Sequence, residues 1–300
     1  MGNNPRFPVR SADATLPIGP RLAAFLNANS RLFTAPRYAQ FENKTRAKLQ
    51  RFLGAVRPTA AQLAAVPPKV ASAAAAPPTA PPASFEIRTK WPRCRATFNR
   101  VSNQAGCGSC WAVCAGEQQG DDWMEGLQVS TASAIRDRRY IRFNGTSAAA
   151  SLPISAWDLT TCCATCTPFA SGCSGGWPAE AFRWSVDAGV PAYTAKTYAR
   201  DKHFGRRLSA FSLDIAAGSV VATFDVYEVF YLYSAGVYAH TMGDHAVRII
   251  GWGVEGGVPY WTAGNSWGSA WGENGFFRIR RNTNEVNFES FIVTASAYKD

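Results

Sequence analysis

Two cysteines in a glycine-rich turn are the residues best placed to do chemistry in this chain. They lie in the run Gln104-Ala-Gly-Cys-Gly-Ser-Cys-Trp-Ala, and the stretch from Trp111 onward is compatible with a helix. A thiol in the first turn of a helix lies where the helix dipole favours the thiolate, and the thiolate is the nucleophile. The sequence therefore makes Cys110 the candidate nucleophile.

A nucleophilic thiol needs a base, and histidine suits this role because its pKa lies near neutrality. The chain offers three histidines. His203 lies in a charged run and is interpreted as a surface residue, and His240 ends a predicted strand or hairpin. His245 opens an apolar strand after Gly243-Asp244, so it is the candidate base.

An asparagine carbonyl can orient the second ring nitrogen of such a histidine. Asn265 follows His245 by 20 residues, and Trp267 comes two residues later, where it can shield the hydrogen bond from water. Each of these residues alone would more often be structural. Together they predict a Cys–His–Asn site.

A helical half and a β half are predicted to position this site. Two short amphipathic helices are expected within residues 20–54, a long surface loop with strand fragments at 128–156, and a helix over 179–187. From Val220 onward, short aromatic and β-branched runs separated by glycine-rich turns predict an antiparallel, barrel-like sheet. The Ala/Pro-rich residues 55–84 cannot bury a core and are predicted to be a linker.

The composition excludes several classes of protein. The chain has 300 residues, of which 47% are hydrophobic, so it can bury a sizeable core. No stretch approaches the roughly 18 apolar residues of a membrane span, and the start lacks the apolar core of a signal peptide. The net charge of +10 comes mainly from residues 1–84, with 11 Lys or Arg and 2 acidic residues, and is interpreted as a solvated basic face. No nucleic-acid or membrane partner and no cofactor is expected.

The eight cysteines indicate either a disulfide framework in an oxidising compartment or a metal site in a reducing one. A four-thiolate zinc site from Cys107-x-x-Cys110 and Cys163-x-x-Cys166 is the less favoured alternative, because 53 residues separate the pairs. Two sequons, at Asn43 and Asn144, fit a secretory route.

The residues of the predicted site resemble those of the papain-like cysteine proteases. The resemblance rests on the run that begins at Gln104, on the 135 residues between Cys110 and His245, and on Asn265-Ser-Trp-Gly. Further runs are similar to the cathepsin B-like subfamily: Trp91-Pro-Arg-Cys, Leu159-Thr-Thr-Cys-Cys, Gly172-Cys-Ser-Gly-Gly-Trp-Pro, Gly236-Val-Tyr-Ala-His and Gly251-Trp-Gly-Val-Glu.

The resemblance implies an α+β, papain-like two-lobe fold, with Cys110 on the helical lobe and His245 and Asn265 on the β lobe. Cys110 would attack the scissile carbonyl, His245 would transfer protons, Asn265 would orient the imidazole, and Gln104 would stabilise the oxyanion together with the Cys110 backbone N–H. Substrate would bind at Gly175, Gly176, Trp267 and Phe291.

The resemblance also implies a proenzyme. Residues 1–54 would be a propeptide-like inhibitory segment, 55–84 a linker with the processing site, and 85–300 the peptidase domain. The expected partners are polypeptide substrates, the chain's own propeptide and cystatin-type inhibitors, and the enzyme is expected to be a monomer. The expected location is a lysosome-like vacuole or the extracellular space.

The chain departs from the cathepsin B-like pattern in several places. Residues 189–202 have no counterpart of the occluding loop, which predicts an endopeptidase with weak or absent removal of C-terminal dipeptides. Phe291 stands where an acidic residue can accept Arg, which predicts an apolar preference at the second residue before the cut. Asp244 replaces an expected Gly, and residues 205–218 form a segment shorter than expected.

The resemblance supports two disulfides, Cys107–Cys173 and Cys163–Cys166. It leaves open the partners of three further cysteines, Cys94, Cys114 and Cys162, with Cys94–Cys162 or a pairing with Cys114 as the options. A pseudo-protease that keeps the fold and the cleft as a binding module is the alternative function.

Overall fold

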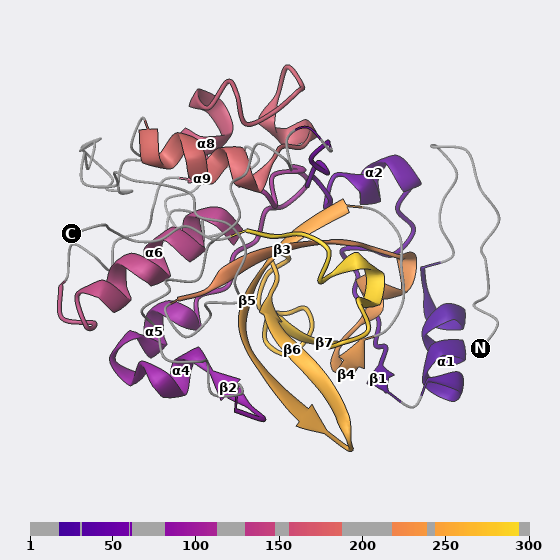
Figure 1. The fold of residues 1–300 in the computed structure, drawn as a ribbon. Coiled ribbons are helices and arrows are strands. Elements are labelled where there is room, and N and C mark those ends of the chain that lie inside the picture. Colours follow the sequence, from indigo (N-terminus) through magenta and orange to yellow (C-terminus); the bar gives the residue numbers. More distant parts are fainter. Residues whose placement is uncertain are drawn as a thin grey trace.

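The sheet forms one half of the molecule, and most of the helices lie together in the other half (Figure 1). The computed structural model describes residues 18–30, 32–59, 61, 82–112, 130–147, 156–187, 218–238 and 244–293. The strands are β1 (Phe33–Thr34), β2 (Phe85–Glu86), β3 (Val220–Asp225), β4 (Ala235–Tyr238), β5 (Asp244–Glu255), β6 (Val258–Gly264), β7 (Phe276–Arg280) and β8 (Ile292–Val293). The strands run in the order β1-β4-β7-β6-β5-β3-β8, and β2 pairs with β5.

The long strand β5 organises the sheet, because β2, β3 and β6 all pair with it antiparallel. The predicted antiparallel pattern is therefore confirmed for these strands, while β4 and β7 are parallel. A two-residue turn, Gly256-Gly257, joins β5 to β6, and both glycines have positive φ, as such tight hairpins require. The hairpin register pairs Arg248 with Gly264, so the residues just after β6 return to the start of β5.

The helices are α1 (Pro20–Asn29), α2 (Arg46–Gln50), α4 (Ile87–Lys90), α5 (Arg95–Phe98), α6 (Ser130–Arg142), α8 (Ala156–Cys162) and α9 (Pro178–Asp187). The two predicted helices within 20–54 and the helix over 179–187 are confirmed. Within the described part of the chain, no helix combines the length and apolar character that a membrane span requires.

The prediction of a surface loop over 128–156 is wrong for helix α6. This helix is buried along much of its length, although it contains several charged residues. Asp137 accepts hydrogen bonds from Arg136 of the same helix, from Arg248 of β5 at 2.6 Å and from the Ser219 hydroxyl at 2.7 Å. Buried charges are tolerated when they are paired in this way, so polarity alone did not indicate exposure here.

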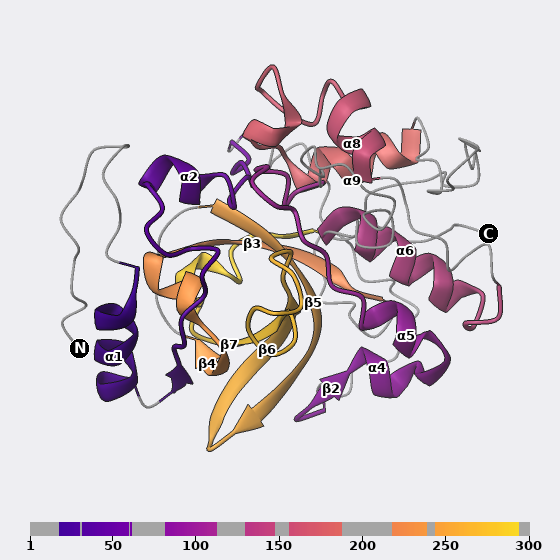
Figure 2. The same cartoon turned by 180° about the vertical axis from the view of Figure 1, so that it is seen from behind.

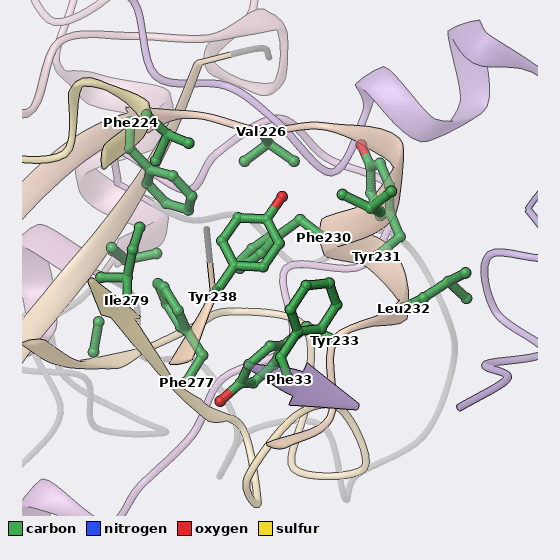
Figure 3. Close-up of a cluster of buried hydrophobic side chains, with 14 of the residues drawn as sticks. Phe33, Phe224, Val226, Phe230, Tyr231, Leu232, Tyr233, Tyr238, Phe277 and Ile279 are labelled. Carbon is green, nitrogen blue, oxygen red and sulfur yellow. The ribbon is translucent and has the colours of Figure 1, made fainter. Parts of the chain in front are cut away.

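The core on the sheet side is unusually aromatic. Figure 3 shows side chains of β3, β4 and β7 converging on Phe230, which lies within 5.0 Å of the ring centroids of Tyr238, Trp271 and Phe277. A second cluster lies on the helical side and includes Trp111, Leu159 and Phe182.

Residues 18–59 are called here the N-terminal segment, and its first elements, α1 and β1, lie at the end of the sheet opposite the main helices (Figure 2). Strand β1 extends the sheet by pairing with β4, and Leu22, Phe33, Phe41 and Leu49 are buried in the aromatic core. A segment of this size needs such a surface to be ordered, because it is too short to bury a core of its own.

Both disulfides implied by the resemblance form, Cys107–Cys173 and Cys163–Cys166. Cys94 and Cys162 do not form a disulfide, so the Cys94–Cys162 option is wrong. Cys114 lies outside the described residues. The zinc-site alternative is also wrong, because three of its four thiolates are in disulfides.

Candidate active site

The turn before the nucleophile is tied to a second loop. The Cys107–Cys173 disulfide joins the two loops, and the Gly108 backbone N–H donates to the Cys173 carbonyl at 2.8 Å. Cys110 follows this turn and is fully buried. Residues 110–112 form a turn, and the rest of the helix predicted to start here lies outside the described residues.

His245 and Asn265 are brought together by the β5–β6 hairpin. Nε2 of His245 lies 2.8 Å from Oδ1 of Asn265, which also accepts the Ser266 backbone N–H. A carbonyl oxygen can only accept, so Nε2 carries the proton and Nδ1 is the basic nitrogen of the neutral ring. This Nδ1 is buried and has no hydrogen-bond partner among the described residues. The arrangement leaves one basic nitrogen available for chemistry.

The nucleophile lies against the first residues of β5. The backbone N–H of Ala246, which directly follows His245, donates to Cys110 Sγ at 3.3 Å. The geometry therefore brings together the three residues of the predicted Cys–His–Asn site. His203 and His240, the histidines not chosen as the base, lie outside the described residues.

Burial keeps both reactive groups uncharged. It raises the pKa of the Cys110 thiol to about 12, although hydrogen bonds from four surrounding backbone groups lower it. It lowers the pKa of His245 to about 4, although the bond to Asn265 raises it. Both shifts share the same cause, since an apolar environment penalises the charged form of each group. In this state the site holds a thiol and a neutral imidazole rather than an ion pair.

Trp267 covers the histidine, as predicted. Its ring lies 5.0 Å from the His245 ring, centroid to centroid, and it is itself buried. Tyr231 stacks on Trp267 at 4.9 Å with an angle of 9° between the planes. The aromatic cover excludes water from the His245–Asn265 hydrogen bond, which strengthens it.

Gln104 is held rigidly beside the nucleophile turn. Its Oε1 accepts from the Ser266 hydroxyl at 2.5 Å, and its Nε2 donates to the Cys107 carbonyl at 2.8 Å. A side-chain amide carries two N–H groups, so one hydrogen of Nε2 remains after the bond to Cys107. Ser266 is a positioning residue that the sequence analysis missed, although it adjoins Asn265 in the Asn-Ser-Trp-Gly run.

Gly175 and Gly176 lie at the edge predicted to bind substrate, and this edge is occupied in the structure. Gly176 donates its N–H to the Gly54 carbonyl and accepts the Val56 N–H, each at 2.8 Å. Ala55 thereby forms a parallel bridge with Gly176. Phe291, the predicted pocket residue, is buried in the core on the helical side, and its carbonyl accepts the Thr223 N–H.

Residues 54–57, called here the crossing, cover the nucleophile. Backbone groups of Gly54 and Ala55 hydrogen-bond Cys110, and the Ala55 N–H donates to the Asp244 carbonyl. Gly54 approaches so closely that a Cβ on it would lie 1.7 Å from the Gly108 carbonyl oxygen. The N-terminal segment therefore blocks the site with its own backbone.

Comparison with known proteins gives a consistent result. The family model described as "Papain family cysteine protease" matches residues 125–209 and 204–296. Cathepsin B-like cysteine proteinase 4 of Caenorhabditis elegans is 35% identical over 271 residues, which cover 71% of this chain and 74% of that protein. The chain belongs to the papain family of cysteine proteases.

Solved structures of precursors from this family resemble the whole arrangement. Procathepsin B S9 from Trypanosoma congolense is 29% identical with a TM-score of 0.69, covering 90% of this chain and 94% of that one. Procathepsin L2 from Tenebrio molitor is 26% identical with a TM-score of 0.63, covering 89% and 86%. The predicted papain-like α+β fold is confirmed, with a proregion. This papain-family chain is a cysteine-type peptidase, and its homologues include cathepsin B-like cysteine proteinases.

The described part of this papain-family chain contains no group of three or more His, Cys, Asp or Glu residues that could bind a metal ion.

Proposed function

We propose that this protein is a cysteine endopeptidase made as a latent precursor. The observation that carries the proposal is the His245–Asn265 hydrogen bond, which leaves Nδ1 of His245 as the basic nitrogen. The next residue on the same strand, Ala246, contacts Cys110 Sγ. Residues 1–54 act as the inhibitory propeptide, with Ala55, Val56 and Arg57 of the following stretch completing the block. Residues 55–84 contain the processing site, and 85–300 form the peptidase domain.

Removal of the crossing starts the chemistry. Because burial is the largest cause of the raised thiol pKa and the lowered imidazole pKa, admitting water lowers the first and raises the second. The proton then moves from Cys110 to Nδ1 of His245, giving a thiolate and an imidazolium. Asn265 keeps the ring oriented for this transfer.

Peptide hydrolysis then follows in two stages. The thiolate of Cys110 attacks the scissile carbonyl, while the second N–H of Gln104 and the Cys110 backbone N–H stabilise the oxyanion. His245 protonates the leaving amine, and the acyl-enzyme remains on Cys110. His245 next takes a proton from water, whose attack releases the acid product and regenerates the thiol. Oxyanion donors of this kind contribute on the order of 3 kcal/mol each in other enzymes.

Two features define the proposed specificity. The absence of an occluding-loop sequence at 189–202 supports internal cleavage, with little release of C-terminal dipeptides. Phe291 supports apolar residues at the second position before the cut. Strong dipeptide release by the processed enzyme, or a preference for Arg over Leu or Phe at that position, would contradict these two proposals.

The test is labelling by a thiol-directed active-site probe after proteolytic removal of residues 1 to about 82. Labelling and peptide hydrolysis are both expected, and both are lost in Cys110→Ala. Cys162→Ala is the control, because this exposed thiol is outside the site and its loss should leave labelling intact. Labelling at Cys110 without turnover of any peptide would indicate the alternative, a pseudo-protease.

A further inference from the structure

Two carboxylates lie directly opposite each other where β3 meets the start of β5. Asp225 ends β3 and Asp244 begins β5, and the two residues are register partners across the antiparallel pair. Like charges placed opposite each other on neighbouring strands destabilise a sheet. The pair therefore needs a cation, and it lies next to the catalytic machinery because His245 follows Asp244.

Arg57 of the crossing supplies that cation in the precursor. Its Nη2 forms an ion pair with Oδ1 of Asp225, and its Nε lies 2.7 Å from Oδ1 of Asp244. A single guanidinium thus bridges both acids through two different nitrogens, which suits its planar fork. The second oxygen of Asp225 is held by Asn287 Nδ2 at 2.8 Å. The carboxylate is therefore already oriented towards a basic side chain.

The acidic pair lies within reach of a chain bound in the cleft. Arg57 comes one residue after Val56, which bonds Gly176, and two residues after Ala55, which bonds the Asp244 carbonyl. Any polypeptide that uses the same backbone positions passes the two carboxylates close to Cys110. Thr223, two residues before Asp225 on β3, donates its backbone N–H to the Phe291 carbonyl, so the acidic pair lies two residues along β3 from the backbone of the predicted pocket residue.

We propose that, once the N-terminal segment has left, Asp225 and Asp244 form a subsite for an arginine side chain of the polypeptide substrate. This inference rests on the proposed endopeptidase function. Arginine is favoured over lysine, because an ammonium cannot span both carboxylates with a fixed fork. The subsite adds a preference for a positively charged substrate side chain to the proposed apolar preference at Phe291. Arg57 occupies it in the precursor as a substrate-like residue.

The effect on specificity is moderate, because the site lies at the rim of the cleft. The Arg57 side chain is 51% exposed, and the side chains of Asp225 and Asp244 are 17% and 35% exposed. Water and salt therefore screen the attraction. We expect arginine to exceed its neutral isostere citrulline by about tenfold in kcat/KM, mostly through KM, and the preference to fall as salt rises.

The test uses enzyme released from the full-length precursor by proteolysis, with peptides that carry Arg, Lys or citrulline in turn at each position on both sides of the cut. The expected result is an Arg-over-citrulline preference at one position, reduced in Asp225→Asn and in Asp244→Asn and lost in the double variant. Each enzyme is compared by its own ratio of kcat/KM for the Arg peptide to kcat/KM for the citrulline peptide. A general effect of Asp244→Asn on the adjacent His245 lowers both values and cancels in this ratio. Glu255→Gln, at the far end of β5, removes one carboxylate elsewhere and should keep the full ratio.

Equal rates for Arg and citrulline at every position, or a preference that survives in the double variant, would overturn the subsite. Failure of the proposed function gives a different result, in which no peptide is cleaved. In that case, the dissociation constants of the same Arg and citrulline peptides are measured with the processed Cys110→Ala protein. This measurement tests the subsite without requiring cleavage. Equal dissociation constants there would reject it, and tighter Arg binding lost in the double variant would support it.

Discussion

The N-terminal segment contacts the rest of the protein in two physically different ways. Residues 18–53 dock on the sheet through buried apolar side chains, and Phe41, which is fully buried, packs on Tyr231 at 5.0 Å and on Trp267 at 5.3 Å. The crossing, residues 54–57, uses backbone hydrogen bonds and the two ion pairs that Arg57 forms at the rim. The first part is held by apolar side chains, whereas the second contacts Cys110 through its backbone.

The difference separates affinity from inhibition. Burial of aromatic groups provides a large, non-directional free energy, which holds the segment in place. Backbone hydrogen bonds contribute little net free energy but fix geometry closely. Residues 18–53, the docking part, therefore determine how long the N-terminal segment stays bound to the sheet. The crossing determines that Cys110 is covered while it stays. Three predictions test this separation, all measured on the full-length chain.

The largest effect is expected for Phe41→Ala. Truncating a buried phenylalanine costs about 3–5 kcal/mol, so the population with the segment undocked should rise more than about a hundredfold. The rate at which a thiol-directed probe labels Cys110 should rise with it. Phe25→Ala is the control, because Phe25 is 48% exposed on α1 and should change labelling little. Equal labelling of the two variants would show that aromatic burial does not hold the segment.

A smaller effect with a different signature is expected for Gly54→Ala. The added Cβ would overlap the Gly108 carbonyl, so the crossing must move away from Cys110. Probe labelling should rise about tenfold or more while hydrogen exchange still shows residues 18–53 protected on the sheet. Gly19→Ala is the matched control, since its Cβ would meet nothing within 4 Å. If residues 18–53 also lose their protection from hydrogen exchange in Gly54→Ala, then the docking part and the crossing open together as one unit.

The smallest effect near neutral pH is expected from His245, measured in Cys110→Ala, where no thiol proton can pass to the imidazole. The pKa of His245 is about 4 while the crossing buries it, against an ordinary 6.5, so the open state binds a proton that the closed state does not. The closed state is therefore most favoured above pH 6.5; it loses about 1 kcal/mol by pH 6, less than the effect of Gly54→Ala, and about 3 kcal/mol by pH 4.

Hydrogen exchange of the crossing in Cys110→Ala, followed from pH 7 to 4, measures this loss. When His245→Gln is added to that variant, the slope between pH 6.5 and 4 should be markedly reduced, because Gln does not titrate. An unchanged slope would assign the pH dependence to groups other than His245.

The grouping of Cys110, His245 and Asn265 could be predicted from the sequence because the proposed chemistry constrains residue type and spacing together. A thiol, a base and an orienting carbonyl must lie close to one another, and the β5–β6 hairpin that joins His245 to Asn265 is encoded locally by Gly256-Gly257. The catalytic roles of the three residues stay a prediction. The strands were predictable for a similar reason, since short runs of β-branched and aromatic residues bounded by glycine-rich turns indicate strands without knowledge of their partners.

Helix α6 and the acidic subsite could not be predicted, because their partners are distant in sequence. Asp137 is stabilised by Arg248, 111 residues away, and Arg57 meets Asp244 at a separation of 187. The sequence around Asp137 shows only polar residues, and the sequence around Arg57 shows only the start of an Ala/Pro-rich linker. The small residues Gly54 and Ala55, which indicated a linker, are also the residues that fit between two close backbones. The domain boundary at 54/55 stays a prediction.

The two loops joined by Cys107–Cys173 form one covalent unit that includes both the turn before Cys110 and the proposed substrate-binding edge. The Gly108–Cys173 hydrogen bond and the bond from Trp111 Nε1 to the Gly172 carbonyl join the same two stretches. Any exchange of specificity between relatives must therefore transfer residues 104–111 and 172–176 as a pair. For protein engineering, these two distant stretches behave as one interchangeable module.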